Sequence, residues 1–166
     1  MKQLDVALDR LPPQNIEAEQ SVLASVLLEN ETLSSVVEIL IPDDFYKNSH
    51  KKIFQSMLDL YSKGEPIDLI TLTEQLSKKE ILEEVGGASY LSSIVNQVPT
   101  SANIKYHSKI VKEKSILRNL IRTATDIVSM TYDEEIEVND LLDRAETKIF
   151  SISEKMVKGT FTSIPT

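Results

Sequence analysis

The sequence predicts an all-α protein, with a compact helical bundle followed by an extended antiparallel helical hairpin. Only 4 glycines and 6 prolines occur among 166 residues, which leaves long stretches free of helix breakers. Hydrophobic residues make up 41% of the chain, enough for a core. Near the end, apolar residues recur at alternating intervals of four and three, which is typical of a helix that packs through one narrow stripe. These residues are Val138, Leu142, Ala145, Ile149, Ile152 and Met156.

The chain should begin with an arm and a capped helix. Residues 1–14 contain two adjacent prolines and little periodicity, so we expect an extended N-terminal arm. The first helix should begin after Asn15, a good N-cap, because Glu17 and Glu19 then place negative charge in its first turn. We expect this helix to end near residue 29.

Proline and glycine delimit the next two helices. Residues 33–40 fit a second helix that Pro42 ends. A third helix should run from about residue 50 to residue 62, with Ser49 as its N-cap and Gly64 as its stop. The inward face of the third helix should consist of Ile53, Phe54, Met57, Leu58 and Tyr61.

Two further helices complete the expected bundle. Leucines at helical spacing from residue 69 onward predict a fourth helix, and its start is open between an N-cap at Asp68 and a capping box that begins at Thr71. Two adjacent glycines then form a turn before a fifth helix that Pro99 ends. The inward residues of the fifth helix should be Tyr90, Leu91, Ile94 and Val95.

The longest helix is expected from about residue 102 to residue 132, a stretch without glycine or proline. Such a helix would be about 45 Å long, more than the width of a compact domain of this size, so part of it should protrude. A turn at residues 133–137 would let the last helix pair with it as a hairpin. The candidates for hairpin packing or self-association are Leu117, Ile121, Ala124 and Val128, and an ordinary core role is equally open for them.

No residue pattern indicates a catalytic, cofactor-binding or metal-binding site. The four glycines cannot form a Gly-x-x-x-x-Gly-Lys-Ser/Thr phosphate loop. His50 and His107 lack a ligand pattern nearby, so we expect them at the surface or at a helix start. We expect the acidic pairs to be solvated groups at helix ends and turns: Glu17/Glu19, Asp43/Asp44, Glu83/Glu84 and Glu134/Glu135. An acid-base hydrolase that uses such a pair is the weakest hypothesis.

The net charge of −8 provides no general attraction to a phosphate backbone. The long helix carries the one basic cluster, formed by His107, Lys109, Lys112, Lys114, Arg118 and Arg122. A solvated face is the favoured interpretation of this cluster, and a nucleic-acid-binding stripe is the alternative. The absence of cysteine, of a signal-peptide pattern and of a long apolar stretch favours a cytoplasmic protein without a membrane partner.

Several segments occur in order over nearly the whole chain: residues 13–23 (PQNIEAEQSVL), Asp44-Phe45-Tyr46, His50, Ile53-Phe54, Pro66-Ile67-Asp68, residues 86–91 (GGASYL), residues 98–103 (VPTSAN), Leu117-Arg118, Leu120-Ile121, Ala145-Glu146 and Ile149-Phe150. Together they resemble the N-terminal domain of the bacterial replicative DNA helicase, the DnaB family. One position departs from the family's pattern, because Ala24 stands where glycine is expected.

The resemblance implies a non-catalytic domain of a protein that acts in DNA replication and in the primosome. It implies a collar in which hairpins pair, from a dimer up to a hexamer built as a trimer of dimers, and which receives primase and, in some bacteria, a loader protein. ATP, magnesium and single-stranded DNA would then bind to a RecA-like ATPase domain beyond Thr166, so this chain would not be an enzyme although its parent would be an ATP-dependent helicase.

The last helix would be the family's linker helix, which docks on a neighbouring subunit. We expect Leu142, Ala145, Ile149 and Ile152 to make that contact, in preference to folding back on their own chain, because the stripe is narrow and terminal. The expected segments are an arm at 1–14, a bundle at 15–100, a long helix and turn at 101–137, a second hairpin or linker helix at 138–157, and the start of a linker at 158–166.

Overall fold

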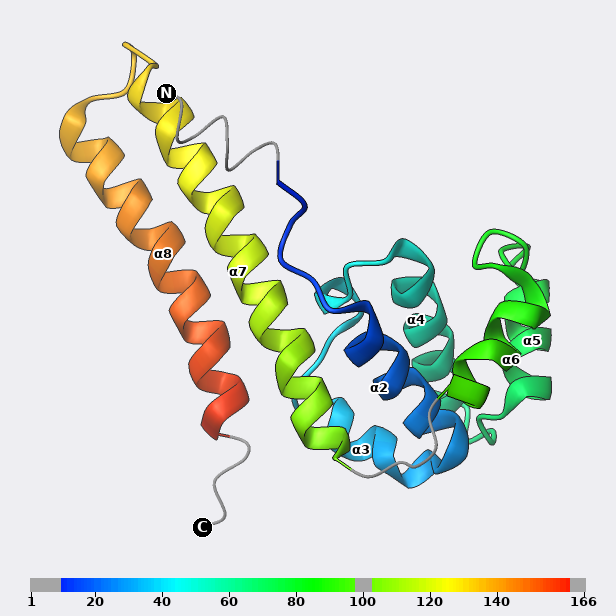
Figure 1. Ribbon diagram of the computed structural model, residues 1–166. Helices are drawn as coiled ribbons and strands as arrows, with labels where there is room; N and C mark the ends of the chain where they lie inside the picture. The colour runs from blue at the N-terminus through cyan, green and yellow to red at the C-terminus, as the bar shows by residue number, and fades with distance from the viewer. Residues whose placement is uncertain (1–9, 98–102, 162–166) are drawn as a thin grey trace. The chain divides into compact units, whose positions relative to one another are not determined.

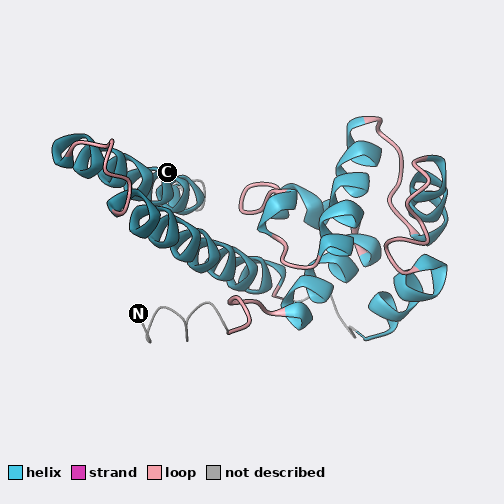
Figure 2. Cartoon of the chain, turned by 90° about the horizontal axis from the view of Figure 1, so that it is seen from above, coloured by secondary structure: helices cyan, strands magenta, loops and turns pink. Residues whose placement is uncertain are grey.

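The computed structural model describes residues 10–97 and 103–161, with side chains as far as Met156. This part of the chain consists of helices and loops and contains no strand, so the all-α prediction is confirmed (Figure 2). The chain divides into two compact units. We call residues 15–113 the bundle, and residues 114–166 together with residues 1–14 the hairpin unit.

The bundle contains short helices that follow one another with brief loops (Figure 1). They are α2 (Ile16–Leu28), the 3₁₀ turn η1 (Asn30–Thr32), α3 (Leu33–Val36), the 3₁₀ turn η2 (Pro42–Asp44), α4 (Asn48–Ser62), α5 (Leu69–Lys78), α6 (Gly87–Gln97) and the first part of α7 (Ile104–Thr131). The rest of α7 and α8 (Val138–Phe161) form the hairpin unit. The boundary between the units therefore lies within α7, and not at residue 100 as the sequence suggested.

The core of the bundle is formed by the apolar faces of α2, α4, α5 and α6. Phe45 and Phe54 lie at its centre, both fully buried, with ring centroids 5.0 Å apart. Ala24, the departure from the family's pattern, is also fully buried. The inward faces expected for the helices are confirmed for most residues, but Tyr61 at the end of α4 is exposed.

Side-chain hydrogen bonds at the N-caps define the starts of two helices, α2 and α5. The Asn15 carboxamide oxygen accepts a hydrogen bond from the Ala18 backbone N–H at 2.9 Å, as expected of an N-cap. At α5 the cap is Asp68, whose carboxylate accepts from the Thr71 backbone N–H at 2.9 Å. The Thr71 hydroxyl accepts in turn from the Asp68 backbone N–H, so these two residues form a reciprocal capping box.

Two other helix boundaries differ from the prediction. At each of them a carboxylate from another helix or from the following turn binds backbone N–H groups. α4 begins after Lys47, not Ser49, since the Glu19 carboxylate accepts hydrogen bonds from the backbone N–H groups just before the helix. The helix expected at residues 33–40 ends at Val36. Pro42 disfavours helical backbone at residue 41, and the carboxylate of the following 3₁₀ turn binds the residue 41 backbone N–H.

α8 ends later than expected. The sequence placed its end at residue 157 because Gly159 and Pro165 follow, but the helix continues to Phe161 and includes Gly159. A glycine inside a helix lowers its stability by about 1 kcal/mol, which weakens a helix without ending it. Pro165 lies outside the described residues.

Candidate functional site

The exposed apolar residues of α7 share one side of the helix. Leu117 and Ile121 are 43% and 40% exposed, Ala124 is exposed, and Val128 is half-buried. At about 100° per residue these four positions fall within about 60° around the helix axis. The structure thus brings the four residues predicted for self-association onto one face, and this face is largely uncovered.

The apolar stripe of α8 is wider than the sequence pattern suggested, and it divides into two edges. One edge is 48% to 74% exposed and spans about 40° around the axis; we call it the uncovered edge, and it consists of Val138, Leu142, Ile149 and Met156. The other edge is half-buried and occupies the adjoining 40° or so; we call it the covered edge, and it consists of Leu141, Ala145 and Ile152.

α7 accounts for the covered edge. The two helices run antiparallel and side by side in both views (Figures 1 and 2). The Lys148 ammonium, next to the covered edge, lies 3.8 Å from the Asp126 carboxylate of α7. Of the residues predicted to dock on a partner, Ala145 and Ile152 are therefore turned toward α7, while Leu142 and Ile149 belong to the uncovered edge.

Two members of the basic cluster of α7, Lys112 and Arg118, are engaged in contacts within the chain. The Lys112 ammonium lies 3.1 Å from the Asp44 carboxylate, and both side chains are mostly buried. The Arg118 guanidinium donates a hydrogen bond to the Pro13 carbonyl oxygen at 2.8 Å. Because Lys112 and Arg118 serve these contacts, the cluster does not form a continuous free stripe for a phosphate backbone. The expectation that Asp44 is solvated is wrong for the same reason.

The structure also assembles a buried polar network that sequence reasoning missed. Glu19 is 1% exposed, contrary to the expectation of a solvated carboxylate. His50 lies at the start of α4, one of the two positions that the sequence suggested, but it is fully buried there. The His50 Nδ1 atom lies 2.7 Å from the Glu19 carboxylate, and His50 Nε2 lies 2.6 Å from the Tyr90 hydroxyl. The His50 and Tyr90 rings are stacked with centroids 5.9 Å apart. We call these three residues the Glu19–His50–Tyr90 relay.

The other hydrogen bonds of the Tyr90 hydroxyl determine which group donates and which accepts in each hydrogen bond of the relay. Its oxygen accepts from the Lys47 ammonium and from the Gln20 carboxamide, both at 3.2 Å, so its two acceptor positions are filled. The hydroxyl hydrogen is then available for His50 Nε2, and His50 Nδ1–H donates to Glu19. The Glu19 carboxylate also accepts from the Tyr46 backbone N–H at 2.7 Å. The relay thus joins α2, α4 and α6 and holds a buried carboxylate with directed donors.

The His50 imidazole is fully buried, and its two ring nitrogens both have partners within the bundle, so we interpret the relay as a structural element. No short motif could reveal it, since its members are 31 and 40 residues apart. The only signal in the sequence was indirect: all three residues lie in segments that carry the family resemblance.

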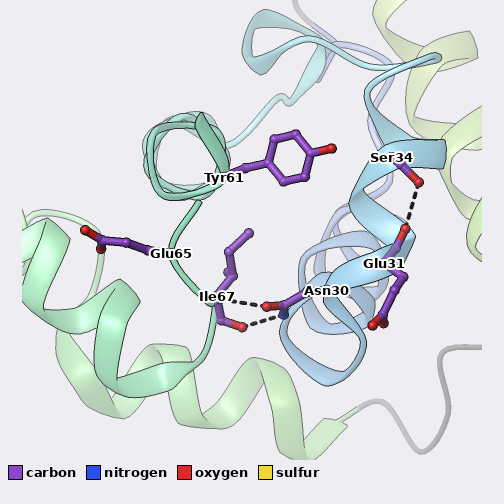
Figure 3. Close-up of a pocket in the computed structure, with 6 residues that line it drawn as sticks. All are labelled: Asn30, Glu31, Ser34, Tyr61, Glu65 and Ile67. Atoms are coloured by element: carbon purple, nitrogen blue, oxygen red, sulfur yellow. Dashed lines mark hydrogen bonds between the residues drawn. The ribbon is translucent and has the colours of Figure 1, made fainter. Parts of the chain in front are cut away.

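A shallow pocket lies between the end of α4 and the start of α3, as Figure 3 shows. The Asn30 carboxamide forms its floor by bonding both the N–H and the C=O of Ile67, at 2.7 and 2.6 Å. The Tyr61 ring points across the hollow toward α3, whereas the Glu65 side chain points away from it. The pocket therefore lacks converging charged groups that would define a ligand.

The described residues contain neither a metal-binding cluster nor a membrane-spanning helix. No group of three or more His, Asp or Glu side chains is placed there to hold a metal ion. None of the described helices is long and apolar enough to cross a bilayer. The candidate functional site is therefore the pair of uncovered apolar faces on α7 and α8.

Comparison with known proteins gives consistent results. The family described as DnaB-like helicase N terminal domain matches residues 11–113. The replicative DNA helicase DnaC of Bacillus subtilis is 54% identical over 96% of this chain. The chain spans only 35% of that relative's length.

Two solved structures support the same relationship. The crystal structure of the N-terminal domain of DnaB helicase from Mycobacterium tuberculosis matches 85% of this chain and 99% of its own, with a TM-score of 0.81 and 40% identity. A DnaB-like replicative helicase, described with its interactions with primase, matches 91% of this chain and 36% of its own, with a TM-score of 0.70 and 26% identity. The fold, the matched residues and these relatives together show that the chain belongs to the family of DnaB-like helicase N-terminal domains.

Proposed function

We propose that this chain is a non-catalytic assembly and docking module of a hexameric replicative helicase. The α7 face around Ile121 would pair with a second copy of the chain, the uncovered edge of α8 would dock on a neighbouring subunit, and the bundle would present a surface to primase and, in some bacteria, to a loader. The observation that carries the proposal is the presence of two apolar faces that the described part of the chain leaves uncovered. Large exposed apolar surfaces of this kind mark interaction sites.

The size of the α7 face indicates weak pairing on its own. Burying the remaining exposed part of Leu117 and Ile121, and of Leu120 beside this face, would stabilise a contact by about 1 kcal/mol per residue. In a two-fold symmetric pair each residue counts twice, which gives roughly 6 kcal/mol. Association costs about 4 kcal/mol or more in lost freedom of motion, so the isolated chain should pair only at high concentration.

Mass measurement across a concentration series tests the self-association. Ile121→Asp should shift the chain toward monomer at concentrations where the unaltered chain is paired, because a carboxylate would be buried without a partner. Ile70→Asp is the matched control, since Ile70 is a 78% exposed isoleucine of α5 and lies outside both faces. Circular dichroism should show unchanged helix content in both variants. Equal mass for Ile121→Asp and the unaltered chain would remove the α7 face from the proposal.

The parent's activity would be ATP hydrolysis coupled to movement along single-stranded DNA, with ATP and magnesium bound outside this chain. The proposal is supported by the helicase name of a relative of which this chain spans 35%. The purified chain should then hydrolyse no ATP above background, and measurable turnover that survives repeated purification would contradict this assignment.

The alternative, binding of nucleic acid by the basic face of α7, has less support because Lys112 and Arg118 are engaged in contacts within the chain. A titration with single-stranded DNA at two salt concentrations separates the two hypotheses. Useful affinity with a steep salt dependence would favour the alternative, and weak binding is what the net charge of −8 predicts.

A further inference from the structure

The charge of α7 and of the turn that follows it reverses along the chain. Residues 104–122 contain six lysine and arginine residues, and Glu113 is the only acidic residue among them. Residues 123–137 contain five acidic residues and no basic one. We call these two stretches the basic part and the acidic part. The reversal coincides with the middle of the apolar α7 face, which consists of Leu117, Ile121, Ala124 and Val128.

Two cations of the basic part border the α7 face. Lys109 is exposed and Lys114 is half-buried, and neither forms an ion pair with another described residue. At about 100° per residue, Lys114 lies about 50° and Lys109 about 90° around the axis from the centre of the face. These two ammonium groups are therefore available to a neighbour that covers the face.

Two carboxylates of the acidic part are available at the other end of the face. Glu134 and Glu135 are exposed, and within the described residues they form no ion pair. Asp126, by contrast, lies 3.8 Å from the Lys148 ammonium of α8. Glu137 directly precedes α8, where the helix dipole favours a carboxylate. The dipole accounts less well for Glu134 and Glu135, which lie farther from α8.

We infer that α7 pairs with α7 of a second copy in the antiparallel orientation, with the basic part of each helix alongside the acidic part of the other. The inference rests on the proposed self-association and adds its orientation and its electrostatic basis. The apolar face is symmetric about a point between residues 122 and 123. A two-fold axis at this point sets Leu117 opposite Val128 and Ile121 opposite Ala124, so larger side chains meet smaller ones.

The same axis brings the unlike charges together. It sets residues 134 and 135 of one copy opposite residues 111 and 110 of the other. Glu134 and Glu135 then lie at the level between Lys109 and Lys114 of the second copy, within about one helical turn of each. Because the pair is symmetric, this contact is formed twice, once at each end of the face.

The parallel orientation is disfavoured by the same residues. In register, it would set Lys109 and Lys114 against their own copies at one end, and Glu134 and Glu135 against theirs at the other. Like charges placed side by side repel and lower the affinity. The antiparallel orientation is therefore the one in which both the charges and the side-chain volumes are complementary.

Charge exchange at the two ends tests this pairing. The acidic-end variant is Glu134→Lys with Glu135→Lys, the basic-end variant is Lys109→Glu with Lys114→Glu, and the exchanged variant combines all four changes. The dissociation constant of the pair is measured by sedimentation at about 0.1 M salt, where the Debye length is about 10 Å. Circular dichroism should show unchanged helix content in all three variants.

We expect each end variant to raise the dissociation constant about tenfold, and the exchanged variant to return to within about threefold of the unaltered chain. The acidic-end variant is the more decisive, because it brings the net charge of −8 closer to zero and general repulsion alone would make it pair more tightly. The matched control, Glu29→Lys with Glu31→Lys, changes the net charge equally at two exposed positions of the bundle and should not weaken pairing. All differences should shrink at about 1 M salt.

Disulfide cross-linking reports the orientation directly, because the chain contains no cysteine. In the antiparallel pair the two copies of residue 124 lie about 5 Å apart along the axis, and those of residue 128 about 17 Å apart. A disulfide requires Cα atoms within about 7 Å. Ala124→Cys should therefore cross-link to itself and Val128→Cys should not, whereas a mixture of Leu117→Cys and Val128→Cys should cross-link between unlike chains.

The outcomes distinguish the inference from the proposed function. If the chain pairs but Val128→Cys cross-links to itself as readily as Ala124→Cys, the helices are parallel and the inference is overturned. It is also overturned if the exchanged variant pairs as weakly as the end variants, or if the matched control is weakened as much as the acidic-end variant. If the unaltered chain does not pair at any concentration, the proposed self-association itself is refuted, and its orientation with it.

Discussion

Removal of the Glu19 carboxylate should strongly destabilise the bundle. In Glu19→Ala the backbone N–H groups of Tyr46 and Lys47 and the Nδ1–H of His50 lose their acceptor at a site that is 1% exposed. Each unsatisfied buried donor costs about 1–3 kcal/mol, and three donors lose their acceptor here. We therefore expect a loss of about 4 kcal/mol, a large part of the roughly 5–15 kcal/mol that stabilises a typical domain.

Glu17 provides a matched control, because it is a glutamate in the same turn of α2 but is exposed. Glu17→Ala should cost less than about 1 kcal/mol, the value of a helix-dipole contact at the surface. Tyr90→Phe should cost about 1–2 kcal/mol, since it removes only the hydroxyl that faces His50 Nε2. The expected order of cost is thus Glu19→Ala, then Tyr90→Phe, then Glu17→Ala.

Urea unfolding monitored by circular dichroism measures these costs as shifts of the midpoint at constant slope. A cost below about 1 kcal/mol for Glu19→Ala, or one equal to that of Glu17→Ala, would show that the relay does not hold the bundle together. The ¹⁵N chemical shifts of His50 give an independent check of its direction: they should report a hydrogen on Nδ1 and an acceptor at Nε2.

The remaining predictions concern two glycines and one surface carboxylate. Gly86→Ala should lower the free energy of unfolding by more than about 2 kcal/mol, because the φ of Gly86 is +112° and an added Cβ would lie 2.7 Å from the Tyr90 Cβ. Gly64→Ala should cost only about 1 kcal/mol, because the φ of Gly64 is +70° but nothing lies within 4 Å of an added Cβ. Equal urea midpoints for the two variants would refute this distinction. At Asp59, burial acts to raise the pKa, but hydrogen bonds from Lys79 and Gln55 outweigh it and the pKa is lowered. The Asp59 carboxylate therefore binds a proton more readily in the unfolded chain than in the folded chain, so Asp59 stabilises the fold at neutral pH and this contribution is lost on acidification. In Asp59→Asn the urea midpoint should fall less steeply with decreasing pH than in the unaltered chain.

Local features of this fold could be predicted from the sequence because their causes are local. The N-cap at Asn15 depends on a carboxamide and a backbone N–H three residues away. The two alternatives for the start of α5 both rested on side chains within one turn, and Asp68 was one of them. In the same way the long helix required only a stretch without glycine or proline, and α7 begins and ends within two residues of the expected positions.

The errors have a common physical origin, which is contact between residues distant in sequence. Glu19 in a first helical turn looks like a solvated dipole group until His50 is folded against it. Asp44 looks like a turn residue until Lys112, 68 positions later, lies beside it. Neither partner can be identified from spacing alone, because tertiary packing decides which polar groups become buried together. The candidate apolar faces were easier to predict, since helical periodicity alone places Leu117 and Ile121 on one side.

The division of the α8 stripe into two edges follows from a mismatch of periods. A seven-residue repeat on a straight helix with 3.6 residues per turn drifts by about 20° per heptad. Val138 and its heptad equivalents Ala145 and Ile152 therefore turn progressively toward α7, and exposure falls from 74% at Val138 to half-burial at the other two. Leu142 and Ile149 start on the far side of the stripe, so the same drift leaves them uncovered along the helix. One repeat thus packs against α7 along one edge and leaves the other edge exposed, where the proposed function would place a second subunit.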